Sequence, residues 1–78
     1  MRIEGLSVRD YAFQWTAGGC PLQQWASGAI GITPAVIQHV EGLLTEADQP
    51  ADREGLFQLL AYLREHEGEP ASRYVPDE

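Results

Sequence analysis

The stretch from Thr33 to Ala47 constrains the fold most strongly, because it combines a helix start signal with a one-sided apolar stripe. Thr33 offers a capping hydroxyl, and Pro34 suits the first helical position. At about 100° per residue, six apolar side chains fall within an arc of about 120°. They are Val36, Ile37, Val40, Leu43, Leu44 and Ala47. The stretch therefore predicts a helix with one buried face. Gly42 weakens this helix by up to about 1 kcal/mol, so we expect another segment to pack closely against it.

Start and stop signals predict three further helices. Ser7, followed by an acid three residues later, can cap a helix that the glycine pair at positions 18 and 19 ends. A short helix over residues 21–27 begins at a proline and stops at a glycine. The last helix covers residues 51–67, and no strand is evident.

These elements predict an all-α fold, a compact four-helix bundle with a flexible C-terminal tail. The chain has 78 residues, which suits a single domain with a thin core. We assign residues 1–68 to that helical domain and expect Trp25 in its core, against Val36 and Val40. Residues 69–78, EPASRYVPDE, contain two prolines and three acids and predict a flexible acidic tail.

The charge balance is strongly acidic. Twelve Asp and Glu residues oppose five Arg residues, there is no Lys, and the net charge is −7. Such a chain is repelled by the phosphates of nucleic acids and by anionic membranes. A basic protein partner fits this charge, although the acids also serve simply to keep a small protein soluble.

The single cysteine and the start of the chain indicate a cytoplasmic protein. Cys20 has no second cysteine to pair with, which favours a reducing compartment. Met1 leads into a polar stretch that does not resemble a signal peptide. No apolar run approaches the 18 or so residues that a membrane helix needs.

The first half of the chain carries the spacing of a known DNA-binding motif. From residue 5 it reads GLSVRDYAFQWTAGGCPLQQWASGAIGITPAV. This resembles the helix-turn-helix of Cro/C1-type repressors, particularly small phage-borne versions, in which G-L-S precedes one helix, W-x-S/N-G ends the next and I-P-x-x-V follows. The matching positions are Gly5, Leu6, Ser7, Ala12, Leu22, Trp25, Ser27, Gly28, Ile32, Pro34 and Val36. The resemblance implies a compact helical bundle.

The departures from that pattern bear on function. The family usually has a full helix before G-L-S, whereas only a few residues stand there in this chain. Its DNA-reading helix carries basic or hydroxylated residues, where this chain has Gln23 and Gln24. Glutamine can pair with the edge of adenine, but phosphate contacts usually supply most of the affinity for DNA. Arg9 is the main candidate for such a contact, so we expect little binding to nucleic acid.

The sequence offers no constellation of catalytic or metal-binding residues. His39 and His66 lie on different predicted helices, without Cys or carboxylate partners at metal spacing, and we expect His39 on the solvent side of its helix. Cys20 has no evident activating base. We therefore expect no enzyme activity, no metal and no cofactor.

The last helix is apolar over too wide an arc to be covered by its own chain. Leu56, Leu59, Leu60 and Leu63 form a core stripe. Phe57 and Ala61 lie to one side of this stripe and Tyr62 to the other, so the apolar arc spans about 260° at about 100° per residue. Aromatic residues beside an arginine are typical anchors of an interface. We therefore predict a partner-binding surface that consists of Phe57, Ala61, Tyr62 and Arg64.

An alternative explanation for this wide arc is that the helix sinks deeper into the bundle and fills the place of the missing first helix.

Together these patterns favour a small, acidic protein-interaction factor. Its partner would be a host protein or a second copy of the chain, and the resemblance to phage regulators suggests a phage or mobile-element protein that binds and inhibits or modulates a host protein. The alternative is a dimeric, sequence-specific DNA-binding regulator that uses Arg9, Gln23 and Gln24.

Overall fold

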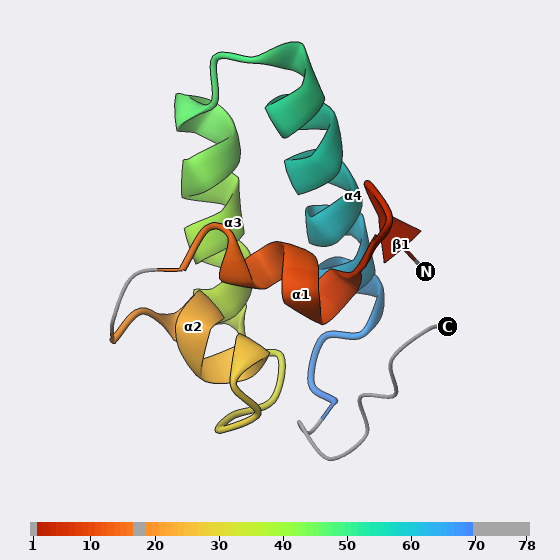
Figure 1. Ribbon diagram of the computed structural model, residues 1–78. Helices are drawn as coiled ribbons and strands as arrows, with labels where there is room; N and C mark the ends of the chain where they lie inside the picture. The colour runs from red at the N-terminus through yellow and green to blue at the C-terminus, as the bar shows by residue number, and fades with distance from the viewer. Residues whose placement is uncertain (1, 17–18, 70–78) are drawn as a thin grey trace.

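Two long antiparallel helices stand side by side, and the N-terminal part of the chain packs across them (Figure 1). The computed structural model describes residues 2–16 and 19–69. The elements within them are β1 (Arg2–Ile3), β2 (Leu6–Ser7), α1 (Val8–Phe13), α2 (Pro21–Ala26), α3 (Pro34–Glu46) and α4 (Pro50–Glu65). The expectation of a compact, mostly helical chain with four helices is confirmed for this part of the chain.

The chain begins with a β-hairpin, so the prediction that it contains no strand is wrong. Arg2 pairs with Ser7 and Ile3 pairs with Leu6 in an antiparallel register. Glu4 and Gly5 make the turn with φ of 54° and 83°, and two such positive values characterise a type I′ hairpin turn. A two-stranded ribbon this short is marginal alone. It is held here because Ile3 is 1% exposed and belongs to the core.

Helix α1 starts as expected but ends early. The Ser7 hydroxyl accepts a hydrogen bond from the Asp10 N–H at 3.1 Å, which confirms the predicted cap. The helix stops at Phe13 because the next N–H groups bond three residues back, which tightens the final turn: Trp15 donates to the carbonyl of Ala12 at 3.0 Å. The glycine pair expected to end this helix falls partly outside the described residues.

Helix α2 has both of its predicted ends. The Cys20 sulfur caps its start by accepting from the Gln23 N–H at 3.3 Å, and Pro21 follows as the first helical residue. After Ala26 the chain turns at Gly28, where φ is 89°. The Gly28 N–H donates to the Trp25 carbonyl at 2.9 Å, and the Ala29 N–H donates to the Gln24 carbonyl at 2.8 Å. This pair of bonds is a Schellman motif, which satisfies the last carbonyls of a helix.

Helices α3 and α4 form the largest contact of the fold. The Thr33 hydroxyl accepts from the Val36 N–H at 3.4 Å, which confirms the predicted cap of α3. At the other end of α3, the guanidinium of Arg53 donates to the carbonyls of Leu44 and Ala47 at 3.3 and 3.2 Å. Because these carbonyls lack partners within α3, Arg53 ties the start of α4 to the end of its neighbour.

One core joins the hairpin and all four helices. Trp25 is only 2% exposed, so its predicted burial is confirmed. The other core residues are Ile3, Val8, Tyr11, Ala12, Leu22, Ala26, Ile32, Val36, Ile37, Val40, Leu56, Leu59, Leu60 and Leu63.

A close contact between two helices lies at a glycine other than the expected one. Gly42 is exposed, and a Cβ there would meet no atom within 4 Å, so the expectation of close packing is wrong. At Gly55 in α4, by contrast, a Cβ would overlap the Tyr11 hydroxyl. Gly55 therefore allows α1 to pack directly on α4.

The end of the described chain is tied back to the loop before α3. Gly68 donates to the Ile32 carbonyl at 2.8 Å, and the Ile32 N–H donates to the carbonyl of Glu69 at 3.0 Å. Glu69, predicted as the first residue of a flexible tail, is thus bonded to the body of the protein. The rest of that predicted tail, residues 70–78, lies outside the described residues. Within the described chain, no helix combines the length and the apolar character that crossing a bilayer demands.

Candidate functional site

The outward face of α4 carries the most exposed large apolar side chain in the described residues. Phe57 is 63% exposed, whereas Leu56, Leu59, Leu60 and Leu63 are all buried. Ala61 lies one turn further along the same face and is also exposed, and Arg64 follows it. Three of the four residues predicted to bind a partner therefore share one solvent-facing side of α4.

Tyr62 belongs to the other side of α4, and the prediction that it points away from the core is wrong. Its ring is half-buried, lies 6.5 Å from the ring of Trp25 and packs against the core. It also lies 4.3 Å from the ring of His66, whose Nδ1 is 2.6 Å from a carboxylate oxygen of Glu69. Trp25 of α2 thus covers this flank of α4, which leaves the Phe57 side as the uncovered one.

Charged side chains border Phe57 and Ala61 along both edges. On the edge beside α3, Arg64 forms an ion pair with Glu41, and Arg53 bonds to the carbonyls at the end of α3. Acidic side chains occupy the opposite edge, where Glu54 accepts from the Gln58 amide at 3.3 Å and Glu65 is exposed. We call the surface of Arg53, Glu54, Phe57, Ala61, Arg64 and Glu65 the α4 face.

The residues proposed for DNA binding lie together at α1 and α2, but the cation among them has a structural contact. The Nε of Arg9 donates to the Ala26 carbonyl at 2.8 Å, at the end of α2. The same guanidinium lies so close to Gly28 that a Cβ there would meet its Nη2 at 2.5 Å. Gln24 is exposed and Gln23 is half-buried. This surface therefore presents amides to solvent, while the guanidinium of Arg9 packs against the end of the helix.

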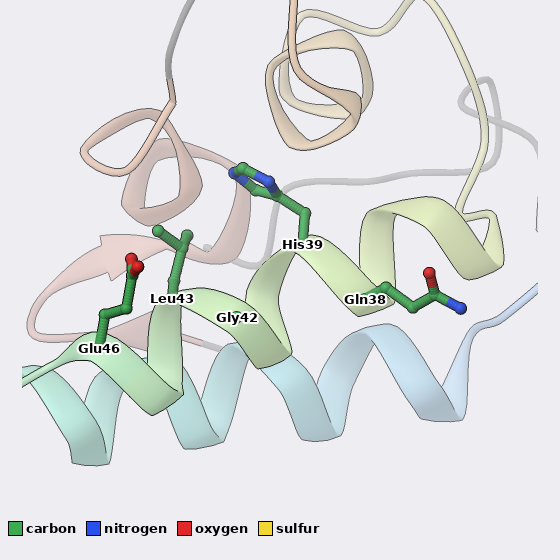
Figure 2. Close-up of a pocket in the computed structure, with 5 residues that line it drawn as sticks. All are labelled: Gln38, His39, Gly42, Leu43 and Glu46. Atoms are coloured by element: carbon green, nitrogen blue, oxygen red, sulfur yellow. The ribbon is translucent and has the colours of Figure 1, made fainter.

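A small pocket lies along the flank of α3 (Figure 2). Its volume is about 260 Å³, and its lining consists of Gln38, His39, Gly42, Leu43 and Glu46. His39, expected on the solvent side, is half-buried, and its Nε2 has no hydrogen-bond partner among the described residues. Small-molecule sites usually measure about 300–1,000 Å³ and present several convergent polar groups, so this pocket is a weak candidate for a ligand site.

Metal ligands do not gather anywhere in the described part of the chain. No group of three His, Cys, Asp or Glu side chains could hold a metal ion there. Cys20 is half-buried and its sulfur caps α2.

Comparison with known proteins finds no matching family, no matching curated protein and no matching solved structure.

Proposed function

We propose that this protein is a protein-interaction factor that binds its partner through the α4 face. The observation that carries this proposal is the 63% exposure of Phe57 in the middle of a helix whose other large apolar side chains are packed inward. Full burial of an exposed phenylalanine side chain contributes about 1.5–3 kcal/mol. Because Phe57 is 63% exposed, the isolated molecule lacks a large part of this stabilisation.

The composition of the α4 face supports the same proposal. Aromatic residues and arginine are enriched among the residues that dominate binding energy at protein interfaces. Phe57 is flanked by Arg53 one turn before it and Arg64 two turns after it, and both cations are positioned by contacts with α3. An aromatic side chain between two positioned cations is a suitable anchor for a protein surface.

The resemblance to Cro/C1-type repressors remains part of the proposal. In support, G-L-S lies just before α1, Trp25 and Gly28 lie at the end of α2, and Pro34 begins α3. We propose a degenerate helix-turn-helix fold in a cytoplasmic phage or mobile-element protein that binds and modulates another protein, without catalytic activity. A DNA-reading role is disfavoured, since residues 19–29 contain no Lys or Arg.

Photocrosslinking in cells tests the location of the binding surface. A benzophenone analogue of phenylalanine is placed at Phe57 and, as a matched control, at Phe13, which is 45% exposed on α1. The proposal predicts a discrete crosslinked adduct from position 57 and none from position 13. Equal adducts from both positions, or none from position 57, would contradict it.

A further inference from the structure

We propose that the α4 face binds a second copy of this chain, with the two α4 helices parallel to each other about a two-fold axis. This inference rests on the proposed function of the α4 face and adds the identity and orientation of the partner. It follows from how charges are arranged around Phe57 and Ala61.

The α4 face is basic along one edge and acidic along the other. At about 100° per residue, Phe57 lies about 40° to one side of Ala61. Arg64 and Arg53 lie about 60° and 80° to that same side. Glu54 and Glu65 lie about 20° and 40° to the opposite side. The contacts of both arginines with α3 agree with this assignment, since they place the basic edge next to that helix.

In a parallel two-fold dimer, the basic edge of each α4 helix meets the acidic edge of the other. When two identical helices pair in parallel, the symmetry axis runs along them, and each edge of one helix meets the opposite edge of the other at the same height. Arg53 then lies near Glu54 of the second copy, and Arg64 lies near Glu65 of the second copy. Each ion pair occurs twice, and Phe57 and Ala61 meet their own equivalents in the centre.

An antiparallel pair of α4 helices brings like charges together. There the symmetry axis is perpendicular to the helices, so basic edge meets basic edge and acidic edge meets acidic edge. Arg53 would lie near Arg64 of the second copy, and Glu54 near Glu65 of the second copy. Since like charges placed together oppose association and select against a wrong partner, the α4 face fits its own copy in the parallel orientation only.

The contacts that already hold the two arginines are compatible with this pairing. A guanidinium carries five N–H donors. Arg64 uses Nη2 for Glu41, and Arg53 uses Nη1 for the carbonyls of α3, so donors remain on both side chains for a carboxylate of the second copy. One helical face makes a small interface, which is typical of a weak and reversible dimer.

Charge reversal with sedimentation equilibrium tests the orientation. Glu65→Arg sets two arginines against each other in the parallel dimer, and Arg64→Glu sets two glutamates against each other. Each exchange occurs twice per dimer, so we expect each variant alone to raise the dimer dissociation constant about tenfold. An equimolar mixture of the two variants restores all four opposite-charge contacts between copies and should dimerise about as well as the parent chain. Glu46→Arg, an exposed charge reversal of equal size on α3, measures the effect of net charge alone, and Glu65→Arg should raise the dissociation constant relative to it.

The outcomes separate this inference from the proposed function. Tighter dimerisation of Glu65→Arg would indicate antiparallel helices and overturn the inference. A purified chain that stays monomeric, while position 57 crosslinks to a different protein in cells, would also overturn it and leave the proposed function standing. A dimer whose dissociation constant responds to none of the α4 variants would overturn the inference, and a missing crosslinked adduct from position 57 would overturn the proposed function as well. Circular dichroism melting of each variant confirms that it is folded in the comparison.

Discussion

Two glycines that look alike in the sequence have opposite roles in the fold. Gly42 and Gly55 both lie inside predicted helices. Helix propensity predicts that each glycine weakens its helix, but it does not predict which of the two glycines is in contact with another segment. The structure places the Tyr11 hydroxyl directly over Gly55 and open space over Gly42. The identity of the neighbour, which a single helix does not encode, decides between them.

The two glycines therefore predict opposite effects of the same substitution. Gly42→Ala should raise the free energy of unfolding by up to about 1 kcal/mol, because alanine favours the helix and its methyl group meets nothing. Gly55→Ala should lower it by about 1–3 kcal/mol, because α1 must move away from α4. Urea unfolding of both variants measures the difference. Equal effects of the same sign would show that α1 does not rest on Gly55.

Tyr11 predicts a loss of stability at alkaline pH. Burial raises the pKa of the Tyr11 phenol above its ordinary value of 10.0, an effect that Trp15 partly opposes and that the charges of Glu4 and Asp52 increase. The folded protein therefore holds this proton more tightly than the unfolded chain does. The protonated Tyr11 phenol therefore contributes fully to the free energy of unfolding below its ordinary pKa. This contribution is lost as the pH rises through the higher pKa of the folded state.

The Tyr11→Phe variant is the control for this effect. Its unfolding free energy should fall less steeply above pH 10 than that of the parent chain. Denaturant titrations at increasing pH measure the unfolding free energy of both proteins. If it falls with pH equally steeply in both, Tyr11 is not the group responsible.

At the scale of the elements, the sequence anticipates those features that local chemistry determines. The caps at Ser7 and Thr33 and the glycine that ends α2 are confirmed, because a hydroxyl or a missing Cβ acts within one turn of its own helix. The hairpin was not anticipated, since its Glu4-Gly5 turn lacks the Asn-Gly pair that marks a type I′ turn most strongly.

The α4 face could be anticipated in part. The 100° periodicity identifies Phe57 and Ala61 as lying outside the leucine stripe, and both are exposed. The same periodicity misplaces Tyr62, because a wide apolar arc does not reveal that Trp25 of a distant helix covers one of its flanks. The helical periodicity predicts the angular positions of the charged side chains around α4. Only the contacts of Arg53 and Arg64 with α3 show that the basic edge adjoins that helix.

The surface of α2 is not expected to bind DNA. It presents Gln24 to solvent, and the nearby guanidinium of Arg9 is bonded to the Ala26 carbonyl, so phosphates meet few cations on this surface. Titration with mixed-sequence duplex DNA at low salt, where electrostatic affinity is greatest, should show no micromolar binding. Micromolar binding that weakens steeply with added salt would restore the DNA-binding regulator as the better function.

At the scale of the whole molecule, the net charge and the α4 face act in opposite directions. A charge of −7 makes two copies repel each other at long range. The basic and acidic edges of the α4 face provide short-range attraction between two copies in one orientation. The balance favours an association that is weak, specific in orientation and dependent on concentration.

Amide NMR spectra recorded at low micromolar and at millimolar protein concentration measure whether the α4 face binds a second copy of the chain. If it does, the amide chemical shifts of residues 53–65 should change with concentration, whereas those of α2 should stay the same. The same experiment on Phe57→Ser should show no such shifts, with all other peaks close to those of the parent chain. Chemical-shift changes centred on residues 23–29, or changes at α4 that persist in Phe57→Ser, would show that the chain does not associate through Phe57 and the α4 face.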